Sequence, residues 1–192
     1  MSEQNEILEI FKKSGALLKG HFLLSSGLHS DEYFEKFQIL QYPNYVEILC
    51  KKLSEKFKNK KIEVVVGPTV GGVIIAYEVA KHLKVKAIFA ERDGDERVFK
   101  RGFTLDEGQR VLIVDDILTT GKSIFEVIDL VKKYKADIAG IGVLLDRSGG
   151  KVKIEEYDLK PLVVVSAKTY KPEECPLCKK GVEIYKPGSR KG

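Results

Sequence analysis

The sequence predicts an α/β fold in which a central, mainly parallel sheet is flanked by helices. Strand-like and helix-like segments alternate from Ile62 to Val165, an order typical of parallel sheets. The strand-like segments are short apolar runs rich in β-branched residues, as in strands buried on both faces. Two of these runs pass through a polar, glycine-containing turn directly into a helical pattern.

The elements expected from periodicity can be placed along the chain. Strands are expected at 62–66, 85–90, 111–114, 138–145 and 162–165, and helices through 43–53, 73–83 and 124–131. Ahead of them, an amphipathic helix is expected through 7–18, broken near Gly15, and then a strand and turn at 20–27. We expect one domain over 1–192, with a core of roughly 41–165 and a small hood from roughly 1–40 plus 166–192.

Length and composition restrict the class of protein. A chain of 192 residues with 43% hydrophobic residues and mixed charge is typical of a globular protein with a sizeable core. No apolar run approaches the roughly 20 residues of a membrane helix, and the polar N-terminus is not a secretory signal. Three cysteines fit a reducing cytoplasm. A net charge of +5 agrees with anionic small molecules. We therefore expect a cytoplasmic protein with neither a nucleic-acid nor a membrane partner.

The stretch 111–123 is the most informative part of the sequence. An apolar strand leads into Asp115 and Asp116, and a turn through Thr119, Thr120 and Gly121 then opens a helix. Such a turn presents backbone N–H groups and the positive end of a helix dipole, which together bind anions. Ionised carboxylates only accept hydrogen bonds, so the two acids suit hydroxyls or a metal. A sugar phosphate satisfies both halves.

Two other interpretations of this stretch are weaker. Gly121-Lys122-Ser123 resembles the end of a nucleotide-binding P-loop, but that motif needs a glycine where Asp116 stands. The acids could instead simply end a strand and cap a helix. Their place at the carboxyl edge of a parallel strand, where open α/β sheets bind ligands, favours a binding site.

A second strand-to-helix turn, 67–72, contains three glycines. Backbone N–H groups of such a turn are also available to an anion. On its own the turn is equally explained as a tight connection between packed elements. Together with the phosphate turn on a neighbouring strand, it indicates a site for a second phosphate group.

The stretch 111–123 resembles the phosphoribosyl pyrophosphate (PRPP) motif of the type I phosphoribosyltransferases. Residues between Gly20 and Arg147 are further similar to the orotate phosphoribosyltransferase family. The resemblance implies the type I phosphoribosyltransferase fold, Mg²⁺ as cofactor, and a homodimer with shared active sites. It also implies transfer of ribose 5-phosphate from PRPP to orotate, which gives orotidine 5′-monophosphate and pyrophosphate in pyrimidine biosynthesis.

The resemblance also assigns site residues. Residues expected to bind PRPP are Asp115, Asp116, Ile117, Leu118, Thr119, Thr120, Gly121, Lys122, Ser123, Thr69, Val70, Gly71 and His29. Residues expected to bind orotate are Thr119, Arg147, Tyr33 and Phe34. A guanidinium suits the orotate carboxylate, although Arg147 could be a surface residue and the two aromatics plain core residues. Asp115 and Asp116 are expected to hold Mg²⁺ mostly through PRPP and water.

A charged arm, 91–103, contains the hairpin signal Asp93-Gly94. The resemblance implies a flexible catalytic loop here, and we expect Arg92 and Lys100 to act in catalysis with the two acids. Arg92 matches the family, but Asp93 stands where a lysine normally follows. Arg97, Lys100 and Arg101 are the cations that could contact pyrophosphate, and a solvated hairpin is the alternative.

Cys175 and Cys178 form one C-x-x-C pair near the C-terminus. Structural zinc requires four ligands. With Cys50 remote and histidine scarce, we do not expect a zinc site within one chain, whereas a site shared across a dimer stays open. A disulfide, or two thiols that shape a turn, is at least as compatible with the sequence.

Two alternative functions use the same fold. A purine-type phosphoribosyltransferase would share the PRPP motif. The features that distinguish this chain from it are Arg147 and the segment around His29. A regulator that senses PRPP without turnover would carry a DNA-binding helix pair. The N-terminal section is too short for one, and no clustered basic recognition helix is evident.

Overall fold

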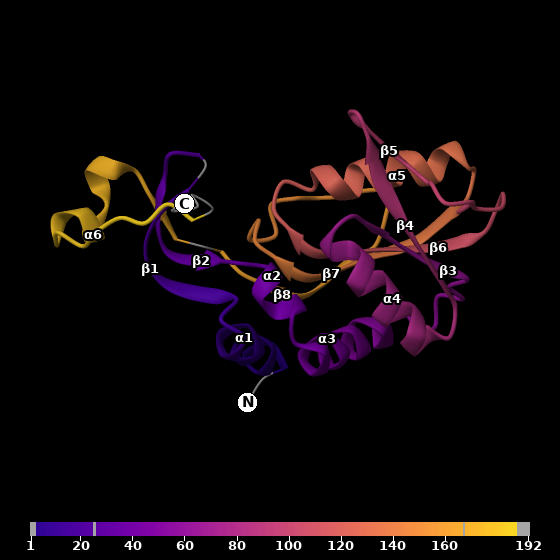
Figure 1. Ribbon diagram of the computed structural model, residues 1–192, viewed down its shortest axis with the longest axis horizontal. Helices are drawn as coiled ribbons and strands as arrows, with labels where there is room; N and C mark the ends of the chain where they lie inside the picture. Colours follow the sequence, from indigo (N-terminus) through magenta and orange to yellow (C-terminus); the bar gives the residue numbers. More distant parts are fainter. Residues whose placement is uncertain (1–2, 25, 167, 188–192) are drawn as a thin grey trace.

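The computed structural model describes residues 3–24, 26–166 and 168–187. Two parts are visible: a six-stranded sheet with helices on both faces, and a small hood at one end of it (Figure 1). No helix among these residues is long and apolar enough to span a bilayer.

The large sheet has the strand order β5-β4-β3-β6-β7-β8. All its pairings are parallel except β4 with β5, which form a hairpin. The strands are β3 (Val64–Pro68), β4 (Lys86–Asp93), β5 (Glu96–Val98), β6 (Arg110–Leu118), β7 (Asp137–Asp146) and β8 (Leu159–Val164). The two strands that carry the polar turns, β3 and β6, are direct neighbours.

Helices cover both faces of this sheet because its strands are apolar on both sides. In β3, Val65 packs in one hydrophobic cluster with α3 (Pro43–Glu55) and α4 (Gly71–Leu83). Val64 and Val66 point to the other face and pack in a second cluster with α5 (Lys122–Lys133). The alternation of side chains along one strand thus builds both halves of the core.

The hood is a three-stranded antiparallel sheet of order β1-β2-β9 with short helical turns. Its elements are β1 (Leu17–Leu23), β2 (His29–Phe34), β9 (Thr169–Tyr170), the 3₁₀ turn η1 (Pro172–Glu174) and α6 (Pro176–Lys179). The N-terminal helix α1 (Glu3–Lys13) precedes it, and α2 (Phe37–Leu40) joins it to α3. Ile7 and Phe11 of α1 pack in the same cluster as α3, so α1 contacts the core.

The predicted α/β architecture, the mainly parallel sheet and the hood are confirmed. Two details differ. Asp115 and Asp116 lie inside β6 rather than after it, because their backbone continues to pair with β7 up to Leu118. The arm forms the hairpin indicated by Asp93-Gly94, as β4 and β5, and most of its residues are exposed as expected, but the side chain of Arg97, which pairs with Arg92 across the hairpin, is buried.

Candidate active site

The two polar turns meet because β3 and β6 are adjacent and parallel. At their carboxyl ends the first turn of α4 lies against the acid pair of β6. A Cβ atom placed on Gly71 would stand 1.8 Å from Asp116 Oδ2, and one on Gly72 would stand 3.3 Å from Asp115 Oδ1. Glycine is therefore required at Gly71 by close approach to a carboxylate.

The acid pair is buried but polar contacts hold it in place. Asp115 is 5% exposed and Asp116 is 1% exposed. The hydroxyl of Ser123 donates to Asp115 Oδ2 at 3.0 Å, and the Asp116 amide donates to Asp115 Oδ1 at 2.8 Å. The Ile117 amide donates to Asp116 Oδ1 at 2.6 Å. Asp116 Oδ2, in contrast, is buried without a hydrogen-bond partner among the described residues.

An unpartnered buried carboxylate oxygen is costly unless a ligand satisfies it. Its chemistry fits a ribose hydroxyl or the hydration shell of Mg²⁺, which prefers carboxylate and water oxygens. The Asp115 and Asp116 side chains therefore fit the magnesium expected from the sequence.

Charge around the acid pair is partly balanced by Lys36, which the sequence analysis did not single out. Lys36 Nζ lies 3.2 Å from Asp116 Oδ1. Burial, followed by the Asp116 charge, raises the pKa of Asp115 to about 7, while Ser123 and Lys36 act in the opposite direction. The pair shares a site in which two negative charges are hard to accommodate without further cations.

The phosphate turn opens α5 in the expected way. Gly121 has a φ of +79° and precedes the helix, and the Gly121 carbonyl accepts a hydrogen bond from the Phe125 amide. Thr119 and Thr120 are exposed, whereas the Leu118 side chain is buried in the core. Only the backbone of Leu118 is thus left to face a ligand. The start of a twelve-residue helix beside hydroxyl groups is a suitable anion site.

The arm contacts this site through the side chain of Arg97 rather than through that of Lys100 or Arg101. Arg97 is 7% exposed, and its Nη1 donates to Thr69 Oγ1 at 2.9 Å. Arg92 and Arg97 both pair with Glu126 of α5, another residue that sequence reasoning missed. Two exposed ion pairs hold the other arm cations: Lys100 with Asp93 at 3.3 Å and Arg101 with Glu91 at 2.9 Å.

The side chain of Arg147 lies between two hollows at the carboxyl edge of the sheet. Tyr33, Thr119 and Arg147 line both of them, one of about 390 Å³ and one of about 420 Å³. The guanidinium carbon stands 5.8 Å from the Tyr33 ring centre and 5.9 Å from that of Phe34. Burial lowers the pKa of Arg147. Its guanidinium forms no hydrogen bond within the described part of the chain, so its donors are available to a ligand.

Phe34 has two roles in the structure. It is buried and packs edge-on against Phe11 of α1, and it also lines one of the hollows beside Arg147. Tyr33 packs against Phe22 of β1. Phe34 is therefore both a core residue and part of the wall of the site.

His29 lies elsewhere in the hood. It is buried in β2, and its Nδ1 lies 3.0 Å from His21 Nε2 and 3.2 Å from Cys178 Sγ. It lines neither of the hollows beside Arg147. The expected contact between His29 and pyrophosphate oxygens gains no support from this position.

Comparison with known proteins identifies the class to which this fold and site belong. A family model described as the phosphoribosyl transferase domain matches residues 37–170. The structure is also similar to the crystal structure of orotate phosphoribosyltransferase from Aeropyrum pernix, with a TM-score of 0.70 at 24% identity over 83% of this chain and 93% of that one. The protein is a phosphoribosyltransferase.

Curated relatives narrow the family. The chain is 50% identical to an orotate phosphoribosyltransferase of Caldanaerobacter subterraneus subsp. tengcongensis over 98% of this chain and 99% of that protein. It is 51% identical to an orotate phosphoribosyltransferase of Thermoanaerobacter sp. over the same shares. The chain therefore belongs to the orotate phosphoribosyltransferase family.

Proposed function

We propose that this protein transfers ribose 5-phosphate from PRPP to orotate, with orotidine 5′-monophosphate and pyrophosphate as products. The observation that carries the proposal is the contact of Gly71 with Asp116, since it joins an anion-binding turn to a buried acid pair. PRPP has the matching chemistry, with a pyrophosphate and a 5-phosphate on either side of two ribose hydroxyls.

PRPP binding is distributed over the two turns. The 5-phosphate accepts hydrogen bonds from the turn 119–123 and the first N–H groups of α5. The ribose hydroxyls donate to Asp115 and Asp116, with the free Oδ2 atom of Asp116 as one acceptor. The pyrophosphate lies over Thr69, Val70 and Gly71, where α4 begins.

Mg²⁺ belongs to this proposal as a cofactor. Asp115 and Asp116 would hold it, mostly through PRPP and water, because carboxylate oxygens suit this ion. Bound there, it supplies positive charge to the departing pyrophosphate. The two carboxylates also orient the ribose through its hydroxyls.

Orotate lies in the hollows beside Arg147. The free donors of Arg147 bind its carboxylate, and Tyr33 and Phe34 form the wall for the pyrimidine. The N1 atom of orotate forms the new bond to the anomeric carbon and gives up its proton to the departing pyrophosphate or to solvent, while the bond from that carbon to the pyrophosphate oxygen breaks. No nucleophilic side chain is needed, so the task of the protein is to position the reactants and stabilise charge.

The arm supplies further charge to pyrophosphate. Arg97 already donates to Thr69 of the pyrophosphate turn. We assign Arg92 and Lys100 to the catalytic step, in which they exchange their present partners Glu126 and Asp93 for pyrophosphate oxygens.

A homodimer in the cytoplasm completes the proposal. Three large apolar side chains are exposed on and beside α4, Val70, Ile74 and Tyr77, which supports an interface there. The three cysteines are free thiols, in agreement with a reducing compartment. Light scattering coupled to size-exclusion chromatography tests the dimer, and a monomeric mass at micromolar concentration contradicts it.

The decisive experiment measures the loss of orotate absorbance with PRPP and Mg²⁺. Pyrophosphate release with adenine, hypoxanthine and xanthine is measured alongside. Of these four bases, we expect only orotate to give pyrophosphate release. Release with a purine base, or PRPP binding without release for any base, overturns the substrate assignment.

A further inference from the structure

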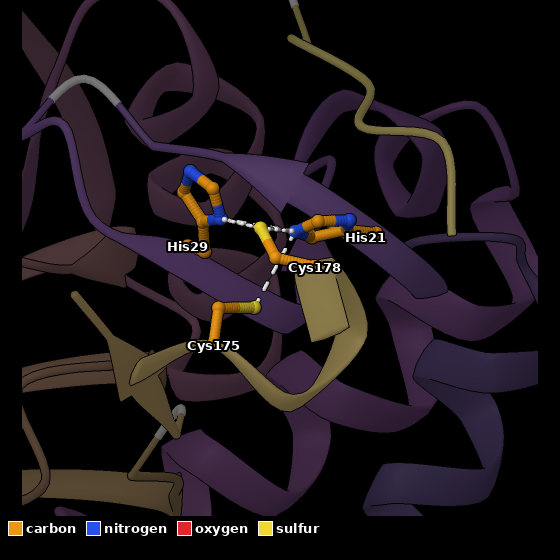
Figure 2. Close-up of side chains that lie close together, drawn as sticks. All are labelled: His21, His29, Cys175 and Cys178. Carbon is orange, nitrogen blue, oxygen red and sulfur yellow. Dashed lines mark hydrogen bonds between the residues drawn. The ribbon is translucent and has the colours of Figure 1, made fainter. Parts of the chain in front are cut away.

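Four side chains from distant parts of the chain converge in the hood, outside the site described above. Figure 2 shows four side chains that point toward one another: His21 of β1, His29 of β2, Cys175 just before α6, and Cys178 within α6. Their ligand atoms, one nitrogen from each histidine and both sulfurs, all lie within 4.8 Å of one another. The expectation that one chain lacks the four ligands of a zinc site is therefore wrong. Two of the three histidines in the sequence lie in this cluster.

Hydrogen bonding alone does not explain the cluster. His21 Nδ1 lies 2.8 Å from the carbonyl oxygen of Val182, which only accepts, so Nδ1 carries the proton. His21 Nε2 in the neutral ring then has a single lone pair. Three groups nevertheless surround Nε2: His29 Nδ1 at 3.0 Å, Cys175 Sγ at 3.4 Å and Cys178 Sγ at 3.6 Å. One lone pair accepts one good hydrogen bond, so two of these approaches need another cause.

We propose that the cluster is a structural zinc site with His21 Nε2, His29 Nδ1, Cys175 Sγ and Cys178 Sγ as its four ligands. Ordinary Zn–N and Zn–S bonds in a tetrahedron place two nitrogens about 3.4 Å apart and a nitrogen and a sulfur about 3.5 Å apart. Four of the six corresponding distances are 3.0 Å between the nitrogens and 3.2, 3.4 and 3.6 Å between nitrogen and sulfur, and the other two, from Cys175 Sγ to His29 Nδ1 and to Cys178 Sγ, are within 4.8 Å. The first four differ from the edges of that tetrahedron by no more than about 0.4 Å.

The ligand set is that of a closed, structural site. Two thiolates and two imidazoles in tetrahedral arrangement suit Zn²⁺ better than the harder Mg²⁺. The two-residue spacing of Cys175 and Cys178 is common in zinc sites. The hydrogen bond from His21 Nδ1 to Val182 fixes the ring and its tautomer, as outer contacts of metal-bound histidines usually do.

The fold of the C-terminal segment explains why such a site is useful. Among the described residues after Val163, only Cys175 is buried. β9 pairs with β2 through only two residue pairs, and α6 has four residues. A segment with so little apolar burial does not order itself by hydrophobic packing. A zinc ion bound to β1, β2 and the C-terminal turn supplies the missing cross-link.

The test uses the full chain, purified without chelators. We expect elemental analysis to find one zinc ion per chain. After zinc removal under reducing conditions, Co²⁺ is expected to give the intense visible absorption of a tetrahedral site with thiolate ligands. Neither readout depends on turnover. A chain that holds no zinc and gives only the weak spectrum of octahedral Co²⁺ overturns the proposal.

Variants identify the ligands. Cys178→Ser and His29→Gln are expected to lose the bound zinc, whereas the matched controls Cys50→Ala and His82→Gln, which alter residues outside the cluster, retain it. Equal loss in the controls contradicts the assignment. If a ligand variant does not fold, a chelator titration of the wild-type chain takes its place. We expect chelation to lower the melting temperature by several degrees and zinc, but not Mg²⁺, to restore it.

The oxidation state of the cysteines gives an independent result. The zinc site requires two thiolates, so alkylation after denaturation is expected to modify all three cysteines of the freshly purified chain. A disulfide between Cys175 and Cys178 overturns the proposal. It would make the mass of the chain two hydrogens lower than that of the reduced chain, and only one cysteine would be alkylated.

Discussion

Arg97 Nη1 donates a hydrogen bond to the hydroxyl oxygen of Thr69 at 2.9 Å. The same nitrogen lies 3.2 Å from the carbonyl oxygen of Ala90, and Arg97 Nε lies 3.1 Å from Glu126 Oε2. One buried guanidinium thus connects the arm, the pyrophosphate turn and α5. Its positive charge is fixed beside the position proposed for pyrophosphate.

The first prediction concerns this connection. Arg97→Ala removes hydrogen bonds to a carboxylate and to the turn, and we expect it to lower the free energy of unfolding by about 1.5 to 3 kcal/mol. The KM for PRPP should rise as well, because the turn loses its support. Arg101→Ala is the control. Its pair with Glu91 is exposed to solvent and should contribute far less to stability than the buried contacts of Arg97. Urea unfolding and PRPP kinetics of both variants check this, and equal effects contradict it.

The second prediction concerns Asp115 and pH. Since the folded state raises its pKa to about 7, folding favours the protonated form. Stability from this group is complete below the unfolded-state pKa of about 3.9 and is lost as the pH rises through about 7. We therefore expect Asp115→Asn to be more stable than the wild type at pH 8, by about 1 to 3 kcal/mol. The gain should disappear near pH 4.

The same variant should be nearly inactive with every base, because it no longer accepts fully from the ribose hydroxyls. Urea unfolding at pH 4, 6 and 8 measures the stability. A variant that is less stable than the wild type at pH 8 contradicts the stated environment of Asp115.

The third prediction tests the close approach of Gly71 to Asp116. A Cβ on Gly71 would stand 1.8 Å from Asp116 Oδ2, so Gly71→Ala forces the carboxylate or the helix start to move. We expect a loss of about 1 to 3 kcal/mol in unfolding free energy and a large rise in the KM for PRPP. In an Asp116→Ala background the same substitution should cost less, and a double-mutant cycle measures this coupling. Strict additivity excludes the contact.

The fourth prediction concerns Lys36. Its ammonium group lies beside Asp116 and acts to lower the pKa of Asp115. Lys36→Gln removes this charge, so the pKa of Asp115 should rise and its ionised form should appear only at higher pH. We expect the acidic limb of the pH profile of kcat/KM for PRPP to move to higher pH. Lys51→Gln on the exposed face of α3 is the control, and an unmoved limb in Lys36→Gln counts against the role.

The fifth prediction concerns Arg147. Its free donors are proposed to bind the orotate carboxylate, so Arg147→Ala should raise the KM for orotate by about 10- to 100-fold. The KM for PRPP should change far less. Arg147→Lys keeps a charge but lacks the two-pronged geometry, and we expect an intermediate effect. Steady-state kinetics with each substrate varied separate these outcomes, and unchanged orotate kinetics in Arg147→Ala removes the residue from the site.

The parts of the site that sequence reasoning located lie in continuous stretches. The strand, acids, turn and helix of 111–123 follow one another directly, so apolar periodicity and turn chemistry suffice to place them. The glycines of 67–72 were recognised in the same way. The sequence analysis also placed the two turns on neighbouring strands, and the sheet order confirms it, although β4 and β5 lie between β3 and β6 in the chain.

The parts that were missed depend on residues far apart in the sequence. Lys36 reaches Asp116 across 80 positions, and His21 meets Cys175 across 154. No local periodicity marks such partners. His29 illustrates the consequence, since the family resemblance implied a ligand contact while its neighbours in space are another histidine and a cysteine.

The sequence by itself determined the α/β class, the phosphate turn and the acid pair, because these follow from short-range patterns and backbone chemistry. Only the tertiary structure decided which distant side chains share a site: Lys36 with the acids, Arg97 with Thr69, and two histidines with two cysteines in the hood. The physical reason is that such contacts are fixed by strand order and hood packing, which arise from the whole chain rather than from any one segment of it.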